Sequence, residues 1–455
     1  MAAQAHVTRR KAATQHLVCG FTSPAAIEQH GPMVIVKGRG AYVWDAAGRK
    51  YLDGLASLWN VAVGHGRTEI ARAIARQARA IAYAPTLMGF ASEPAQQLAA
   101  RIAALAPRGL TRVIFTSGGS EANESVIRLV RLYWRLQEHP HKIKIVALNR
   151  GYHGSSTGAA SLTGLPQFHK YYEPLLPGVV RMARPFCYRC ELGLTYPECG
   201  LACADELERL IEREGGETVG AFIAEPVQGV GGVVVPPPGY FERIRAICDR
   251  HEVLMVADEV ITGFGRLGRR FGIERWKAVP DMIVFAKGVT SGYIPLGGVI
   301  LHEQIYSALV DAGEDFALYH GFTYSGHPVA CAAGLANLDI IEREGLIGRT
   351  RKLAPYFKRR LSTLARHAMV GEVRAAGLMG ALELVADRRT KEPFAATLNV
   401  PVRIRKAAMA RGVIVRVSAE TIVVCPPLII TQAQIDYLVS VLDEAIGTVA
   451  GELSR

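Results

Sequence analysis

The segment VPDMIVFAKGVTSGYIPLGG carries a lysine whose position suggests chemistry. Residues 282–286 have the apolar composition of a buried strand, and Lys287 follows them directly. Lysine is rarely buried unless it is paired or used, although its long side chain can also reach water from the rim of a sheet. A second apolar run, LMVA, is followed by Asp258. Two strand ends therefore offer an amine and a carboxylate.

The strand RVIF runs into TSGGSEAN, residues 116–123, which opens a predicted helix. Small residues, free amides and hydroxyls at a helix N-terminus can hold an anion, although the same residues also serve as an ordinary N-cap. We take Ser117, Gly118, Gly119 and Ser120 as candidate anion-binding residues.

Two further strands end beside groups that could act on a ligand. The strand KIKIVALN is followed by Tyr152 and His153, and the strand AFIAEP reaches Glu225. Val260 lies two residues beyond Asp258. These strand ends add an aromatic ring, an imidazole, a second carboxyl group and an apolar side chain.

The elements that carry these groups alternate between apolar strands and helices from residue 111 to residue 300. Such alternation predicts a large, mostly parallel sheet of the seven-stranded type with helices on both faces. Ligands in open α/β sheets bind beyond the carboxyl ends of the strands. We therefore expect the strand-end groups to meet in one site.

Pyridoxal 5′-phosphate (PLP) uses all of these groups. Its aldehyde forms a Schiff base with an amine, which Lys287 supplies. Its ring nitrogen stays protonated beside a carboxylate, which Asp258 supplies. Its phosphate needs amides and hydroxyls, and its ring needs an aromatic cover and an apolar floor; the residues predicted for these roles are Gly119, Ser120, Tyr152 and Val260.

A possible nucleotide motif is set aside. Residues 263–268 spell G-x-G-x-x-G, but the following RRFGIERWK is not the apolar helix that a dinucleotide site requires. The sequence also has no GxxxxGK[ST] phosphate loop.

The chain resembles the class III (subgroup II) aminotransferases of PLP fold type I over most of its length, from about residue 33 onward. The motifs that carry the resemblance occur in family order: TSGGSEAN (116–123), GYHG (151–154), AEPVQGVGG (224–232), VADEVITGFGR (256–266), FAKGVTSGYIPLGG (285–298) and HGFTYSGHPVACAAG (320–334). The resemblance implies a cofactor site made by Lys287, Asp258, Tyr152, Gly119 and Ser120.

The resemblance also implies roles that spacing alone does not show. Glu225 is expected near the edge of the cofactor ring. Thr323, in GFTYSGHP, is expected to reach the phosphate of the neighbouring subunit's cofactor, which implies a homodimer with shared active sites. Whether dimers pair into tetramers is left open.

Two more residues point to the ω-amine:pyruvate transaminases within this family. Trp59 stands where those enzymes place an aromatic pocket wall, although a tryptophan here also suits a core. Arg416 stands where they carry a mobile arginine, which pairs with the carboxylate of pyruvate or of an amino acid; an arginine facing water at a sheet edge is the plainer reading. The resemblance implies ping-pong transfer from an amine or ω-amino donor to an α-keto acid.

Bulk composition is that of a soluble protein of 455 residues, with 49% hydrophobic residues. Length argues for more than one domain: we expect residues 1–60 and 326–455 to form a smaller α+β domain and residues 61–325 the large cofactor domain.

No apolar run approaches the roughly 20 residues of a membrane helix. The net charge of +12 is scattered, which disfavours nucleic-acid binding. The basic N-terminus is read as a frayed arm of a cytoplasmic protein.

Three alternatives stay open. The first is a taurine- or β-amino acid:pyruvate transaminase. The second is another fold type I PLP enzyme, such as an aminomutase, decarboxylase, racemase or phospholyase. The third is a zinc-binding module on a four-cysteine loop, although reduced or packed thiols are the simpler reading; its residues are Cys187, Cys190, Cys199 and Cys203.

Overall fold

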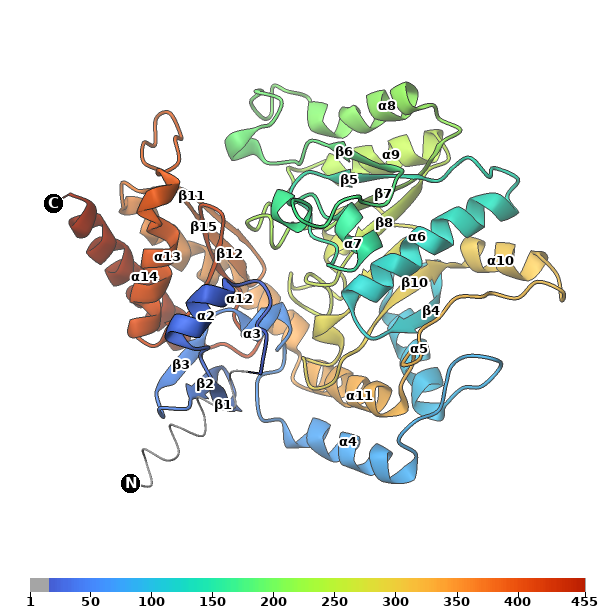
Figure 1. Ribbon diagram of the computed structural model, residues 1–455, viewed down its shortest axis with the longest axis horizontal. Helices are drawn as coiled ribbons and strands as arrows, with labels where there is room; N and C mark the ends of the chain where they lie inside the picture. The colour runs from blue at the N-terminus through green and yellow to red at the C-terminus, as the bar shows by residue number, and fades with distance from the viewer. Residues whose placement is uncertain (1–15, 455) are drawn as a thin grey trace.

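The computed structural model describes residues 16–454 (Figure 1), so most of the predicted basic arm lies outside the described residues. Its centre is a seven-stranded sheet in the order β4-β10-β9-β8-β7-β5-β6. Only β10 runs antiparallel to its neighbours. The strands are β4 (Leu110–Thr116), β5 (Lys144–Leu148), β6 (Val179–Met182), β7 (Val219–Ala224), β8 (Leu254–Asp258), β9 (Met282–Phe285) and β10 (Gly297–His302). The predicted large, mostly parallel sheet is confirmed.

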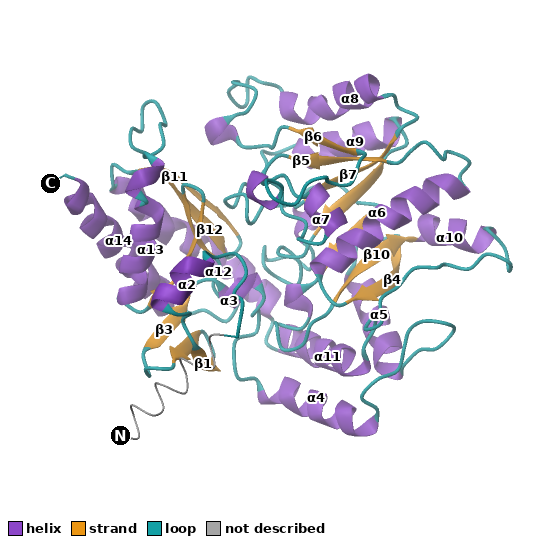
Figure 2. Ribbon diagram, in the orientation of Figure 1, coloured by secondary structure: helices purple, strands orange, loops and turns teal. Residues whose placement is uncertain are grey.

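Successive residues of the central strands enter two different cores. On β8, Met255 packs into one cluster of buried residues, whereas Leu254 and Val256 pack into the other. Helices therefore cover both faces (Figure 2). One face carries α6 (Gly119–Leu136), α7 (Thr157–Leu162) and α10 (Glu303–Asp311); the other carries α4 (Thr68–Ala80), α5 (Glu93–Leu105), α8 (Ala202–Glu214), α9 (Tyr240–Arg250) and α11 (Pro328–Arg343).

Two four-stranded sheets form a second body, drawn beside the large sheet in Figure 1. One joins β1 (Ile35–Arg39), β2 (Tyr42–Asp45), β3 (Lys50–Asp53) and β13 (Val413–Ile414); the other joins β11 (Val370–Ala376), β12 (Met379–Leu384), β15 (Thr421–Val424) and β14 (Arg416–Ser418). Val413 pairs with Leu52, so the two ends of the chain share a sheet. The helices here are α2 (Pro24–His30), α3 (Ala56–Trp59), α12 (Leu346–Ser362), α13 (Val400–Ala410) and α14 (Gln432–Leu453).

The carboxyl ends of β4, β5, β7, β8 and β9 share one edge of the large sheet, because these strands run in the same direction. The strand-end groups named from the sequence are therefore carried to one side of the molecule. Within residues 16–454 no helix combines the length and the apolarity needed to cross a membrane.

Candidate active site

Asp258 ends β8 as a buried carboxylate with three hydrogen bonds. Asn123 Nδ2 donates to its Oδ2 at 3.0 Å, and the amide of Val260 donates to its Oδ1 at 3.1 Å. His153 Nδ1 lies 2.8 Å from Oδ2. The carboxyl group is only 3% exposed, so these contacts fix its orientation.

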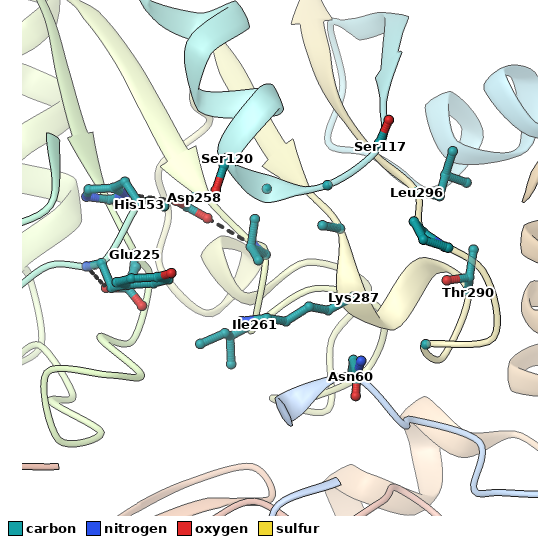
Figure 3. Close-up of a pocket in the computed structure, with 18 of the residues that line it drawn as sticks. Asn60, Ser117, Ser120, His153, Glu225, Asp258, Ile261, Lys287, Thr290 and Leu296 are labelled. Carbon is teal, nitrogen blue, oxygen red and sulfur yellow. Dashed lines mark hydrogen bonds and ion pairs between the residues drawn. The ribbon is translucent and has the colours of Figure 1, made fainter. Parts of the chain in front are cut away.

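Lys287 follows β9 and extends its side chain across a pocket toward the side where Asp258 and Glu225 lie (Figure 3). Its φ of 44° is in the left-handed region, a strained conformation for a residue with a Cβ. Its amine has no hydrogen-bond or ion-pair partner within residues 16–454. Burial lowers its pKa to about 8, Asp258 and Glu225 oppose that shift, and nearby Arg416 adds to it. The side chain can therefore be a neutral nucleophile near physiological pH.

The loop between β4 and α6 leaves room for an anion. Gly118 is fully extended, and α6 starts at Gly119 without a side-chain cap. A Cβ on Gly297 would lie 2.8 Å from the Gly118 backbone, so this close approach requires glycine. A Cβ on Gly119 would lie 3.0 Å from the Val260 side chain, which leaves little room for it. Ser120 Oγ lies in the same cavity wall and accepts a hydrogen bond from the Ser155 amide at 3.2 Å.

Tyr152 and Glu225 form the wall beyond β5 and β7. Glu225 accepts hydrogen bonds from the amides of Tyr152 at 3.0 Å and Gly229 at 2.8 Å. Burial nevertheless raises the pKa of Glu225 to about 7, since the charge of His153 only partly offsets it. The Tyr152 ring packs against Phe168, with 5.3 Å between ring centres.

These residues surround one cavity of about 300 Å³ (Figure 3). Ser117, Gly118, Gly119, Ser120, Tyr152, His153, Glu225, Asp258, Val260 and Lys287 all line it. The sequence interpretation missed several other lining residues: Asn60, Gly154, Ile261, Ala286, Thr290, Gly292, Ile294, Pro295 and Leu296. All of the missed residues except Asn60 lie inside the quoted motifs. Asn60 lies next to Gly292, where an added Cβ would be 2.8 Å from the Asn60 amide nitrogen.

The lining residues fit PLP. Lys287 provides an unpaired amine, Asp258 a carboxylate in a fixed orientation, and the glycine-rich N-terminus of α6 a place for an anion. Two buried polar atoms, His153 Nε2 and Asn123 Oδ1, have no hydrogen-bond partner among the described residues. Both belong to residues that contact the Asp258 carboxylate. Groups of this kind in one cavity match the demands of an aldehyde, a ring nitrogen and a phosphate.

Three predicted residues lie outside the cavity lining of this chain: Trp59, Thr323 and Arg416. Trp59 is 2% exposed and packs in the main core. Thr323 is exposed, and its carbonyl accepts a hydrogen bond from Tyr83 Oη at 2.8 Å.

Arg416, on β14, is half-buried and close enough to Lys287 and Tyr152 to influence the pKa of each. Burial lowers the pKa of Arg416 itself. Its guanidinium pairs with no acidic group of the described chain, so a positive charge stands unpaired near the amine.

The four-cysteine loop has no arrangement suited to a metal. Across residues 16–454, no group of three or more His, Cys, Asp or Glu side chains could hold an ion. All four cysteines are free thiols, and burial together with the neighbouring thiols raises the pKa of Cys203 to about 12. The zinc alternative therefore gains no support from the geometry.

Comparisons with known proteins agree with this chemistry. Residues 24–446 match the family Aminotransferase class-III. A putrescine–pyruvate aminotransferase from Pseudomonas aeruginosa is 41% identical over 436 residues, which cover 96% of this chain and 95% of that protein. An (S)-enantioselective ω-transaminase structure from Thermomicrobium roseum has a TM-score of 0.94 at 44% identity, with 98% of each chain covered. An amine transaminase from an uncultivated Pseudomonas species, solved with PLP bound, has a TM-score of 0.92 at 40% identity, covering 95% of this chain and 98% of its own.

Proposed function

Because this chain belongs to the class III aminotransferases, we propose that it takes an amino group from an ω-amine or diamine and passes it to pyruvate. It is a PLP-dependent transaminase of fold type I, and the transfer from an amino donor to a keto acid follows from the family. The relative named for putrescine and pyruvate supports this choice of substrates.

The observation that carries the proposal is the unpaired guanidinium of Arg416 near Lys287. A keto acid brings a carboxylate that can pair with this group in a two-pronged contact. A simple amine brings no such group and needs only the apolar part of the site. One cavity can thus serve both halves of a ping-pong reaction.

When bound, PLP supplies the electron sink that stabilises the charge left on the substrate carbon after a proton is removed. The pKa of Lys287 is about 8, so its Nζ is neutral at higher pH and can take and return that proton. Asp258, oriented by His153 and Asn123, holds a proton on the ring nitrogen. We assign the phosphate to Ser117–Ser120 and the two ring faces to Tyr152 and Val260.

We also propose a homodimer with shared active sites. Segments 81–90 and 318–327 lie side by side, since Thr86 Oγ1 donates to the Ser325 carbonyl at 2.9 Å. They carry exposed apolar side chains around Thr323, a pattern typical of an interface: Ile81, Tyr83, Met88, Phe90, Leu318, Tyr319 and Tyr324. We place Thr323 at the phosphate of the cofactor bound by the partner subunit. We place Trp59 behind the part of the cavity wall that its neighbour Asn60 forms.

The proposal also includes the domain boundaries and the location of the protein in the cell. We assign a small domain to the two ends of the chain and a large domain to its middle, which the shared β3–β13 pairing supports. Because α11 packs on the large sheet, we move the second boundary, expected at residue 326, to the end of α11 at Arg343. A cytoplasmic location is supported by eight cysteines that are all free thiols.

A panel of donors and acceptors tests the substrate assignment. Putrescine, 1-phenylethylamine, 4-aminobutyrate, β-alanine and taurine are each paired with pyruvate or 2-oxoglutarate, and the transferred amine is measured. We expect the first two donors with pyruvate to be fastest. Taurine or β-alanine as the preferred donor would favour the sulfonate or β-amino acid alternative. Turnover without any acceptor would indicate a different PLP reaction.

A further inference from the structure

A second cavity of about 440 Å³ lies away from the active site, where α5 and the end of α11 meet the start of α12 and the loop of residues 264–274. In Figure 1, α5 and α11 lie beside the large sheet, whereas α12 lies toward the smaller sheets. The cavity therefore lies at the junction of the two bodies.

Three arginines line this cavity without an acidic partner: Arg269, Arg270 and Arg351. Within the described chain, the only side-chain hydrogen bond of the three goes from Arg351 Nε to the Gly268 carbonyl at 3.2 Å. The adjacent Arg101 differs, since it pairs with Asp339 at 3.0 Å and Glu342 at 2.9 Å.

The acidic groups in the lining are already engaged. Glu342 pairs with Arg101, and one oxygen of Glu274 accepts hydrogen bonds from the amides of Arg270 and Phe271. Burial lowers the pKa of Arg275, and the nearby charge of Arg269 adds to that shift. Four arginines and two glutamates line the cavity, so positive charge is in excess at this rim, and a bound anion would offset it.

The floor of the cavity is apolar. It is formed by side chains from α5, α11, the start of α12 and the 264–274 loop: Leu105, Phe264, Leu338, Ile341 and Ile347. Guanidinium groups bind phosphate or carboxylate through paired N–H donors, while an apolar floor favours a ligand with an apolar body. A concave cavity with both features suits a small molecule better than an extended polyanion.

We propose that this cavity binds a small organic anion, in which a phosphate or carboxylate meets Arg269, Arg270 and Arg351 and an apolar body lies on Phe264 and Ile341. The bound anion also contacts the loop of residues 264–274. Phe264 packs close to Gly288, where an added Cβ would lie 3.4 Å from the Phe264 Cβ. This site is independent of the donor and acceptor assigned above.

Calorimetry on the cofactor-loaded enzyme tests the proposal. In that form PLP occupies the phosphate site proposed at Ser117–Ser120, so an added anion cannot bind there. The probe is AMP, compared with adenosine and with inorganic phosphate. We expect AMP to bind more tightly than either fragment, because only AMP carries both an anion and a flat body. The double variant Arg269→Ala/Arg270→Ala should weaken AMP binding at least about tenfold, as expected when charge-assisted hydrogen bonds are lost.

The matched control is Lys358→Ala/Arg359→Ala, which removes two exposed charges farther along α12. This control should retain AMP binding within about twofold, with both variants melting at the wild-type temperature because all four side chains are exposed. Absence of AMP binding would overturn the proposal. So would an equal loss in the control variant, which would indicate general charge attraction, or adenosine binding as tightly as AMP.

Discussion

His153 Nδ1 lies 2.8 Å from Asp258 Oδ2, while Nε2 of the same ring has no hydrogen-bond partner among the described residues. Asn123 donates both to that carboxylate and to the His153 carbonyl, at 3.0 and 2.7 Å. Strand β8, the start of α6 and the turn after β5 are thus tied together at one buried acid. Its position is set by neighbours from two other parts of the chain.

Asp258→Asn should lower kcat by several orders of magnitude, because a neutral amide no longer holds a proton on the cofactor's ring nitrogen. Asn123→Ala keeps the charge and removes one hydrogen bond to it, so its loss should be only about ten- to hundredfold. Steady-state kinetics at saturating cofactor separates the two variants. An Asp258→Asn enzyme no slower than Asn123→Ala would refute the assignment.

The pH dependence of cofactor attachment reports on Lys287. Its pKa is lowered from 10.5 to about 8, and only the neutral amine attacks the aldehyde. When apo-protein is mixed with PLP, the rate of appearance of the visible band should rise about tenfold per pH unit below 8 and level off above it. A rate that keeps rising toward pH 10.5 would show an unperturbed lysine.

Arg416→Ala should raise the KM for pyruvate about ten- to hundredfold, since a charge-assisted contact to the carboxylate is lost. The KM for a simple monoamine donor should change little. Arg403→Ala, which breaks a surface pair with Glu452, is the control. Equal effects of Arg416→Ala on both substrates would exclude the carboxylate role.

Thr323→Ala should speed cofactor loss from the dimer while leaving the melting temperature unchanged, because this exposed hydroxyl is assigned to the partner's phosphate. Dialysis followed by absorbance measures retention, and sedimentation measures the oligomer. Thr390→Ala, another exposed threonine, controls for loop substitutions. Retention equal to the wild type, or a monomer that holds cofactor fully, would contradict shared sites.

The strand-end chemistry was predictable because it depends on local sequence. Lys287 and Asp258 each terminate a short apolar run, and parallel strands bring such ends together whatever the loops do. The edge strand β6 escaped prediction because Val179–Met182 is partly exposed and does not alternate.

Other positions depend on long-range contacts that no short pattern reveals. Trp59 sits in a turn with positive φ at Ser57 and at Trp59 itself, and this turn sends its ring into the core. The place of Arg416 depends on the β14–β15 pairing and on a hydrogen bond from Ser418 to the Val230 carbonyl. The hydrogen bond joins residues 188 positions apart, so no local pattern predicts it.

The central claim is that Lys287 holds the cofactor covalently beside Asp258. Borohydride reduction of the purified enzyme, followed by digestion and mass spectrometry, reads out the attached lysine directly. We expect the phosphopyridoxyl mass on the peptide that contains Lys287, and no label or visible band in Lys287→Ala. A label on a different lysine, or a yellow and active Lys287→Ala enzyme, would contradict it.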